Sequence, residues 1–390
     1  MSFIIDLIIY AHDGRGLGHV SRSVAIGLAV RRLFPKMSVL LITGCSAVAE
    51  LIGDGDLDWI KLPSYKTKIL AGKSSGAEGP SQIDDKTLGE LRAQNIRHIF
   101  KTYRPKVFLA DHTPQGKHKE LIACHSVSHE TVRVLGIRAV VGDVDKVWSE
   151  FSADFFKKGY SKIFWYGDSK ITGINEIKRV KSCYGIDPIE TGYVSRFSEL
   201  GQLSIDDGAE SKNLAGVVSV PWSGEGTFLF LEKLAEAISQ IDHSYGLWKI
   251  YMNLREATAY EAIKFFEFLP NVCFSQVGPE FLCDLHGSRS AVIYGGYNSL
   301  TDVMASGTPA VVLLRGMKDG EQEEHAALLA SKSSAIVDVF SEDNITADCL
   351  RESLLKCIQT KPEVSSVNLN GAENAARYLA SLAGVTDANS

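Results

Sequence analysis

Short apolar segments alternate with longer segments of helical periodicity along most of the chain. The candidate strands form two series, at 4–11, 38–43, 107–110, 139–142, 162–166 and 188–191, and then at 216–220, 247–252, 272–276, 290–294, 309–314 and 334–338. Most are rich in β-branched residues and lack strict alternation, which is typical of strands buried on both faces of a parallel sheet. The intervening segments are long enough for crossover helices, most clearly 20–33 and 228–241. The pattern predicts an α/β chain of repeated β-α-β units.

Two series of strands predict two Rossmann-like domains. The segment 197–213, FSELGQLSIDDGAESKN, is polar and acidic, and we expect it to link them. The expected N-terminal domain is then 1–196 and the C-terminal domain 214–365, followed at 366–390 by a helix and tail that pack back on the N-terminal domain. A second irregular stretch, 65–85, contains AGKSSGAEGPSQ and is interpreted either as a mobile loop at the cleft between the domains or as plain disorder.

Composition and charge narrow the class of protein. The 390 residues include 41 Lys and Arg against 47 Asp and Glu, a net charge of −6 that argues against a nucleic-acid partner. No apolar run reaches the roughly 18 residues of a membrane span, which leaves only peripheral contact with a membrane open. The seven cysteines form no CxxC pair and predict reduced thiols in a cytoplasmic protein.

A glycine pair follows one of the predicted strands of the C-terminal half. Gly295 and Gly296 let the chain turn sharply and approach a ligand closely. Asn298 and Ser299 are good N-cap residues, so a helix is expected to begin there, and its positive end suits a diphosphate. Asp302 lies about one turn beyond the glycines, where a carboxylate can accept hydrogen bonds from ribose hydroxyls.

A second strand-to-helix turn follows directly. The first helix is expected to end at Gly307, and Pro309 opens the next strand. A loop at 316–320 then leads to Glu321 and Gln322, which open another helix. The two turns therefore bring polar side chains to the carboxyl edge of one sheet, where open α/β sheets bind ligands.

The first strand is followed by the sequence HDGRGLGHVSR. Gly16 and Gly18 predict a tight loop that opens a helix, with His19 near its N-terminus. A helix N-terminus disfavours protonation, and a neutral imidazole can take a proton from a hydroxyl group. Asp13 is the rival base, or the group that orients His19. Arg22, one turn into the helix, either binds a phosphate or acidic acceptor or lies in solvent.

More histidines occur farther along the N-terminal half. Asp111 and His112 follow another predicted strand, so they are expected at the same carboxyl edge, in contact with an acceptor or in support of residues that are. The helical spacing of His125 and His129 permits metal binding, but no cysteine or carboxylate set completes such a site. The sequence therefore predicts no bound metal.

Several of these motifs occur together in a known group of enzymes. The GGYNS segment resembles the donor-binding motif of the glycosyltransferase family 28 superfamily, which includes the peptidoglycan N-acetylglucosaminyltransferase. The chain most resembles a bacterial branch of predicted glycosyltransferases with GLGH near the N-terminus. The likeness recurs in GLGHVSR (16–22), LPSYK (62–66), ADHTPQG (110–116), WYGD (165–168), ETGYVSR (190–196) and GGYNS (295–299). It implies the GT-B fold, an α/β fold with two Rossmann-like domains whose parallel sheets face each other across a cleft.

The resemblance also implies roles for individual residues. It implies that the donor phosphates contact Gly295, Gly296, Asn298 and Ser299 and that the ribose contacts Asp302. It further implies that the donor sugar contacts Glu321 and Gln322 and that the base lies between Val277 and Phe281. The sequence departs from the branch where a triple glycine is usual and VPWSGEG stands instead. Ser223 and Gly224 can still supply amides to a phosphate, whereas Pro221 and Trp222 alter the loop and leave the identity of the donor open.

The resemblance implies an inverting, metal-independent glycosyltransferase. It would use no cofactor and would move a sugar from a nucleotide-sugar co-substrate, most readily a UDP-sugar, to a hydroxyl-bearing acceptor. The donor would bind the C-terminal domain and the acceptor the N-terminal domain, with His19 or Asp13 as base. The alternatives are a nucleotide-sugar hydrolase or epimerase on the same fold and a non-enzymatic sugar- or nucleotide-binding regulator. The sequence decides neither the acceptor nor the oligomeric state.

Overall fold

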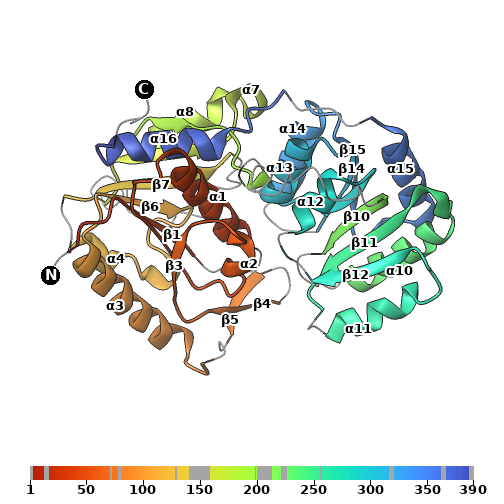
Figure 1. The fold of residues 1–390 in the computed structure, drawn as a ribbon, viewed down its shortest axis with the longest axis horizontal. Coiled ribbons are helices and arrows are strands. Elements are labelled where there is room, and N and C mark those ends of the chain that lie inside the picture. The colour runs from red at the N-terminus through yellow and green to blue at the C-terminus, as the bar shows by residue number, and fades with distance from the viewer. Residues whose placement is uncertain are drawn as a thin grey trace. The chain divides into compact units, whose positions relative to one another are not determined.

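The chain forms two compact units in the computed structural model. The structure describes residues 3–12, 17–70, 73–77, 81–127, 130–139, 159–197, 199, 213–220, 226–254, 257–276, 278, 280–315, 320–361 and 366–385. Unit 1 comprises Met1–Glu199 and Asn368–Ser390, and unit 2 comprises Leu200–Val367. Each unit is a parallel sheet covered by helices, as Figure 1 shows.

The sheet of unit 1 has the strand order β3-β2-β1-β6-β7-β8-β9, and every neighbouring pair is parallel. Its strands are β1 (Leu7–Ala11), β2 (Val39–Thr43), β3 (Asp58–Lys61), β6 (Val107–Asp111), β7 (Val132–Arg138), β8 (Lys162–Tyr166) and β9 (Pro188–Glu190). Every residue of β1, β2 and β6 is buried, as expected for strands covered on both faces. The order runs outward from β1 in both directions, so the chain reverses its direction across the sheet between β1 and β6.

The helices of unit 1 lie on both faces of its sheet because right-handed crossovers change face when the strand order reverses. They are α1 (Gly18–Leu33), α2 (Val48–Ile52), α3 (Asp85–Tyr103), η1 (Lys117–Lys119), α4 (Ile122–His125), α7 (Ser169–Thr172), α8 (Ile174–Tyr184) and α16 (Gly371–Leu382). Figure 1 shows α1 and α3 on opposite faces, with the C-terminal helix α16 packed beside α1. The contact with α16 explains why α1 is buried along most of its length.

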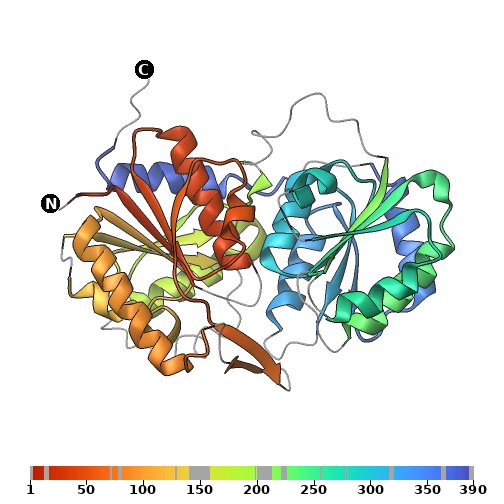
Figure 2. The same ribbon diagram turned by 60° about the horizontal axis from the view of Figure 1, so that its bottom comes forward.

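A short antiparallel hairpin occupies part of the segment 65–85, which the sequence leaves as an irregular loop. It consists of β4 (Lys66–Leu70) and β5 (Lys73–Ala77), which pair with each other and with no strand of the main sheets. Figure 2 shows the hairpin projecting from unit 1. The expectation of an irregular loop is therefore wrong for these residues.

The sheet of unit 2 is also parallel throughout, in the order β12-β11-β10-β13-β14-β15. Its strands are β10 (Leu214–Val220), β11 (Leu247–Met252), β12 (Val272–Gln276), β13 (Ala291–Tyr294), β14 (Ala310–Leu314) and β15 (Ile336–Ser341). Counted from β10, this is the 3-2-1-4-5-6 order of a Rossmann sheet. The chain reverses its direction across the sheet between β10 and β13.

The helices of unit 2 are likewise divided between the two faces. They are α10 (Thr227–Ser239), η2 (His243–Tyr245), α11 (Ala257–Ile263), η3 (Lys264–Phe266), α12 (Glu280–His286), α13 (Tyr297–Ser306), α14 (Glu321–Ala330) and α15 (Ala347–Gln359). Figure 1 shows α10 and α15 on one face and α12, α13 and α14 on the other. Phe230, Leu234, Trp248 and Leu350 belong to a buried core beneath α10 and α15.

The structure confirms the prediction of two α/β units with parallel sheets. The predicted series has a strand at 139–142 and misses β7 at Val132–Arg138; Ala139 follows β7 outside any strand, and 140–142 lie outside the described residues. Residues 132–142 are apolar almost throughout, and such a run does not mark which part forms the strand. The strand β3 is missing from the sequence-based series because three of its four residues are exposed.

Candidate functional site

Each sheet has one place where loops diverge from adjacent strands toward opposite faces. This switch point lies between β1 and β6 in unit 1 and between β10 and β13 in unit 2. Open α/β sheets bind ligands in the crevice at the carboxyl ends of such strands. His19 and Asp111 belong to the switch point of unit 1, and Gly295 and Gly296 belong to that of unit 2.

His19, Arg22 and Asp111 form a hydrogen-bonded cluster at the switch point of unit 1. The Nδ1 atom of His19 lies 2.5 Å from Oδ2 of Asp111. Arg22 donates to both carboxylate oxygens of Asp111, through Nε at 3.1 Å and Nη2 at 2.8 Å. His19 and Arg22 reach the carboxylate together because they lie three residues apart on α1, which begins where the chain leaves β1, while Asp111 ends the adjacent strand β6.

This geometry fixes the protonation state of His19. Burial and the guanidinium groups of Arg22 and Arg138 hold the pKa of His19 well below its usual value. A neutral imidazole carries one ring proton. Nδ1 of His19 lies 2.5 Å from the Asp111 carboxylate, which can only accept, and 3.2 Å from Nη2 of Arg22, which can only donate. The carboxylate contact is the shorter one and Nη2 donates to Asp111 itself at 2.8 Å, so the proton is placed on Nδ1. The Nε2 atom is left with a lone pair, and no residue that the structure describes donates a hydrogen bond to it. His19 is thus neutral, oriented by Asp111, and able to accept a proton.

Two further histidines flank His19. The rings of His12 and His19 meet edge to face with centroids 3.9 Å apart, and the centroids of His19 and His112 are 5.8 Å apart. Burial is the main cause that holds the pKa of both flanking histidines well below the usual value. The sequence analysis named His112 but missed His12, although His12 directly follows β1 and this position was the available signal.

Arg22 lies buried on α1, and most of the loop that precedes this helix lies outside the described residues. The side chain of Arg22 is buried and donates to Asp111, so the expectation that it lies in solvent is wrong. Its role toward a phosphate or an acidic acceptor stays a prediction. Gly18 is the first residue of α1, which Leu17 precedes without a side-chain cap. Five predicted site residues lie outside the described residues, namely Asp13, Gly16, Ser223, Gly224 and Val277.

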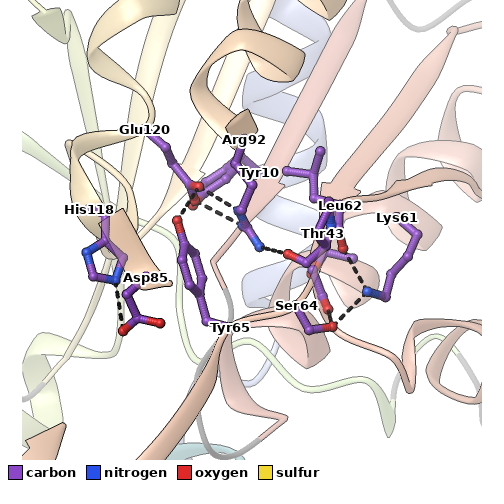
Figure 3. Close-up of polar contacts among 12 residues, drawn as sticks. Tyr10, Thr43, Lys61, Leu62, Ser64, Tyr65, Asp85, Arg92, His118 and Glu120 are labelled. Carbon is purple, nitrogen blue, oxygen red and sulfur yellow. Dashed lines mark hydrogen bonds and ion pairs between the residues drawn. The ribbon is translucent and has the colours of Figure 1, made fainter. Parts of the chain in front are cut away.

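A buried ionic network lies beside this switch point (Figure 3). Arg92 donates to both oxygens of the Glu120 carboxylate, at 2.6 and 3.0 Å, and both side chains are fully buried. The hydroxyls of Tyr10 and Tyr65 also donate to this carboxylate. The remaining guanidinium nitrogen of Arg92, Nη1, donates to the carbonyl of Pro63 at 2.6 Å. The network therefore ties the segment after β6 to β1, to α3 and to the chain that leads into the hairpin.

At the switch point of unit 2, the helix α13 begins without a side-chain cap. Its N-cap is Gly296, and the first backbone bond of the helix runs from the N–H of Leu300 to the carbonyl of Gly296 at 3.0 Å. The expectation that Asn298 or Ser299 caps the helix is wrong, because both lie inside its first turn. The amides of that turn therefore point out of the helix end, as an anion requires.

The two glycines before α13 have different surroundings. A Cβ atom at Gly295 would come within 2.8 Å of a methyl group of Leu314, so only glycine fits there without rearrangement. A Cβ atom at Gly296 would meet no atom of the described residues within 4 Å. Gly295 thus serves the packing of the turn on β14, and the open space over Gly296 leaves room for a ligand to approach the amides of α13.

The other predicted donor residues fall at nearby elements of unit 2. Asn298 and Ser299 are partly buried, whereas Asp302 is buried on the second turn of α13. The helix α14 begins at Glu321, and the amide oxygen of Gln322 is buried and accepts no hydrogen bond from the described residues. Phe281 on α12 packs edge to face against Tyr251, with ring centroids 5.2 Å apart. Their roles toward a donor stay predictions.

The sequence analysis did not predict a second buried network at the carboxyl edge of unit 2. Glu342 accepts hydrogen bonds from Arg315 Nε at 3.1 Å, from the hydroxyl of Tyr294 at 2.6 Å and from that of Thr227 at 3.0 Å. The guanidinium of Arg315 also stacks 3.8 Å from the centroid of the Tyr294 ring. Tyr294 ends β13, Arg315 directly follows β14, Glu342 directly follows β15, and Thr227 begins α10. The network therefore joins the loops around the switch point.

Metal-binding clusters and membrane-spanning helices are both absent from the part of the chain that the structure describes. No group of three or more His, Cys, Asp or Glu side chains in this part of the chain is arranged to hold a metal ion. No helix among the described residues is long and apolar enough to cross a membrane.

Solved structures with a similar fold include enzymes of two kinds. UDP-GlcNAc 2-epimerase of Methanocaldococcus jannaschii, in complex with UDP-GlcNAc and UDP, has a TM-score of 0.60 at 12% identity, over 97% of this chain and 99% of that chain. UGT71G1 of Medicago truncatula, complexed with UDP-glucose, has a TM-score of 0.60 at 11% identity, over 98% and 99%. MurG of Acinetobacter baumannii has a TM-score of 0.53 at 12% identity, over 96% and 99%.

These likenesses confirm the expected fold. The chain has the two-domain α/β fold of the GT-B class, and the similarity extends over nearly its full length. No protein-family model matches the sequence, and no curated protein sequence matches it. At identities near one in eight, the likeness concerns the fold, and any activity has to be argued from the residues at the two switch points.

Proposed function

We propose that this protein is a glycosyltransferase that moves a sugar from a nucleotide-sugar donor, most readily a UDP-sugar, to a hydroxyl group. The observation that carries the proposal is the His19–Asp111 pair, a neutral imidazole held at 2.5 Å by a buried carboxylate at a switch point. This arrangement is that of a general base whose orientation and tautomer are set by an acid. Two structural neighbours, solved in complex with UDP-GlcNAc and with UDP-glucose, support the donor class.

In this proposal the nucleoside diphosphate of the donor binds unit 2 at the N-terminus of α13. The open space over Gly296 admits the phosphates to the amides of the first turn. The partial positive charge of a helix N-terminus favours an anion there, typically by about 0.3–1 kcal/mol for each charge. Ser299 adds an amide and a hydroxyl that bond to no other described residue, so both are available to the diphosphate.

The proposed reaction is a single displacement. Nε2 of His19 takes the proton of the acceptor hydroxyl while the hydroxyl oxygen forms a bond to the anomeric carbon of the donor sugar. The bond between that carbon and the phosphate oxygen breaks, and the departing diphosphate keeps the electron pair. Asp111 stabilises the imidazolium that forms and remains ionised, and the amides of α13 stabilise the leaving diphosphate. A single displacement inverts the configuration of the anomeric carbon.

The first test is binding. A thermal-shift screen with UDP-glucose, UDP-N-acetylglucosamine, GDP-mannose, ADP-glucose and dTDP-glucose identifies the donor, because a ligand that binds the folded state raises its apparent stability. Calorimetry then compares UDP affinity in Gly296→Val and wild type. Valine should fill the space over α13 and weaken UDP binding by at least tenfold. Equal UDP affinities would remove the proposed phosphate site.

The second test is turnover. Release of nucleotide is followed with the donor from the screen and a panel of sugar and lipid alcohols. His19→Ala should lower kcat by about 10²–10⁴-fold, the usual contribution of a general base, and leave UDP affinity unchanged. Replacing the exposed His98 by Ala is the matched control and should change neither quantity. Unchanged turnover in His19→Ala would end the assignment of the base.

The products distinguish the rival activities that use the same fold. Rapid release of free sugar without any acceptor identifies a hydrolase, in which His19 activates water. A new sugar still bound to its nucleotide identifies an epimerase. Binding without turnover across the acceptor panel identifies a regulator. The transferase proposal requires a new glycoside whose formation depends on the added alcohol.

A further inference from the structure

His112 occupies a backbone conformation that histidine rarely adopts. Its φ angle is +61°, in the left-handed region. The N–H of Thr113 donates to the carbonyl of Asp111 at 2.7 Å and closes a three-residue turn centred on His112. The N–H of His112 donates to the carbonyl of Gly136 at 2.7 Å, which anchors this turn to β7. The surrounding strands therefore hold His112 in a strained turn directly after the carboxylate that orients His19.

The tautomer of His112 follows from its neighbour on β7. Nη2 of Arg138 lies 3.4 Å from Nε2 of His112, and a guanidinium group can only donate. Nε2 of His112 therefore accepts, and the single proton of the neutral ring sits on Nδ1. Burial, Arg138 and His19 all hold the pKa of His112 well below its usual value, which keeps the ring neutral.

The Nδ1 atom of His112 is a buried donor without an acceptor among the described residues. The side chain is more than nine-tenths buried, and Nδ1 forms no hydrogen bond to this part of the chain. Buried polar groups in folded proteins are paired in the great majority of cases. A strained backbone and an unpaired buried donor on the same residue are both features that a bound ligand commonly accounts for.

His19 and His112 offer opposite halves of a hydrogen-bonding site. His19 presents a lone pair on Nε2, and His112 presents an N–H on Nδ1. Their ring centroids are 5.8 Å apart. Two hydrogen bonds of about 2.8 Å that meet at one oxygen span up to roughly 5.6 Å between the nitrogens. The separation of the two rings is of this order, so one oxygen that both donates and accepts can bridge the two nitrogens, and a hydroxyl group is such an oxygen.

We propose that His112 binds the nucleophilic hydroxyl through Nδ1–H and positions it for deprotonation by His19. The proposal rests on the proposed function and adds the chemical class that the switch point of unit 1 selects. A carboxylate or the dianion of a phosphate monoester has no proton to give to His19, whereas an alcohol or water does. With one lone pair held by His112 and the proton shared with His19, the oxygen keeps one lone pair that can form the bond to the anomeric carbon.

The test compares two replacements that both tolerate the left-handed backbone. His112→Asn keeps a side-chain N–H close to the position of the imidazole Nδ1, and His112→Gly removes it. The measured rate is UDP release from UDP-glucose and from UDP-N-acetylglucosamine, with water as the nucleophile and then with added alcohols. His112→Gly should lower kcat by about 10–100-fold, the usual cost of a misplaced reactant, and His112→Asn should restore most of the loss.

His118→Gly is the matched control. His118 also has a left-handed φ, +53°, on the same segment, but it is exposed and lies outside the cluster around His19. Melting temperature and UDP affinity are measured for all variants, and both should remain close to wild type. Nitrogen-15 spectra of histidine-labelled wild type report the ring proton directly, and His112 should carry it on Nδ1.

The outcomes separate this inference from the proposed function. If wild type turns over and His112→Gly matches it, or His112→Asn falls as far as His112→Gly, the inference is overturned and the proposed function stands. A proton on Nε2 of His112 also overturns it. If wild type neither binds nor cleaves any nucleotide sugar, the proposed function fails and the inference fails with it. Loss in His112→Gly, recovery in His112→Asn and no change in His118→Gly support it.

Discussion

Acidification should destabilise unit 1 because several of its histidines are buried in the neutral form. The pKa of His12, His19 and His112 lies well below its usual value, and that of His125 falls to about 4, in each case with burial as the largest cause. In the unfolded chain the same groups titrate near 6.5. Below that pH the unfolded state binds more protons than the folded state, so the free energy of unfolding decreases as the pH falls through 6.5 toward the folded pKa values.

The size of the effect follows from proton linkage. Each histidine that stays neutral in the folded state lowers the free energy of unfolding by about 1.4 kcal/mol between pH 7.5 and pH 5.5. Four such groups together give about 5 kcal/mol, against a total stability of roughly 5–15 kcal/mol for a domain. Carboxylates titrate mainly below this window and contribute little to the difference.

Urea denaturation at pH 7.5 and pH 5.5, followed by tryptophan emission, measures this loss. His112→Asn removes one titrating group, so its loss between the two pH values should be smaller than that of wild type by about 1.4 kcal/mol. Because the substitution lies in unit 1, any difference between the variants reports on that unit. The exposed His98→Asn is the control and should lose as much as wild type. Equal losses in wild type and His112→Asn would refute the argument that His112 is neutral in the folded state.

Three further predictions use other contacts of the described residues. Glu120→Gln leaves a fully buried guanidinium without its counter-charge and should lower the free energy of unfolding by about 3–5 kcal/mol, whereas Tyr65→Phe removes one hydrogen bond and should cost about 1 kcal/mol; equal losses in urea would contradict this. Gly295→Ala forces a Cβ atom to within 2.8 Å of β14 and should cost about 1–3 kcal/mol, while Gly296→Ala should fold normally, which melting curves decide. Asp111→Asn should lower kcat by 100-fold or more with unchanged UDP affinity, and a full rate in steady-state assays would exclude its orienting role.

The parts of the fold that the sequence predicts are those with a local signal. Strands such as 162–166 and 247–252 coincide with β8 and β11 because both are short apolar runs bounded by polar residues. The helix α13 ends at Gly307 as expected, with Gly307 in the left-handed region at φ +71°. The predicted start of α13 is wrong because the sequence favours a polar cap, and the structure uses a glycine without one. The signals for the start and the end of α13 are both local. The start also depends on how the preceding turn is built, which the local sequence does not show.

The buried ionic pairs have no such signal. Arg92 and Glu120 are 28 residues apart, and Arg315 and Glu342 are 27 residues apart, each on a different element. A charged residue in a sequence is usually exposed, and only the tertiary fold identifies the few that are buried with a partner. The same reason applies to the orienting acid of His19. The sequence suggested Asp13, which is close along the chain and lies outside the described residues, whereas the acid that contacts His19 in the structure is Asp111, 92 residues away.

The pairing of His19 with Asp111 is nevertheless a consequence of topology. In a sheet whose order runs outward in both directions from its first strand, that strand lies beside the one at which the order reverses. His19 opens the helix after β1 and Asp111 ends β6, so any residues in these two positions would meet. The same rule brings the loops after β10 and β13 together in unit 2. The chemistry of the two switch points differs. The loops of unit 1 carry imidazoles and a carboxylate, which exchange protons. In unit 2, α10 and α13 begin after Gly226 and Gly296 without side-chain caps, and the N-terminus of such a helix suits an anion.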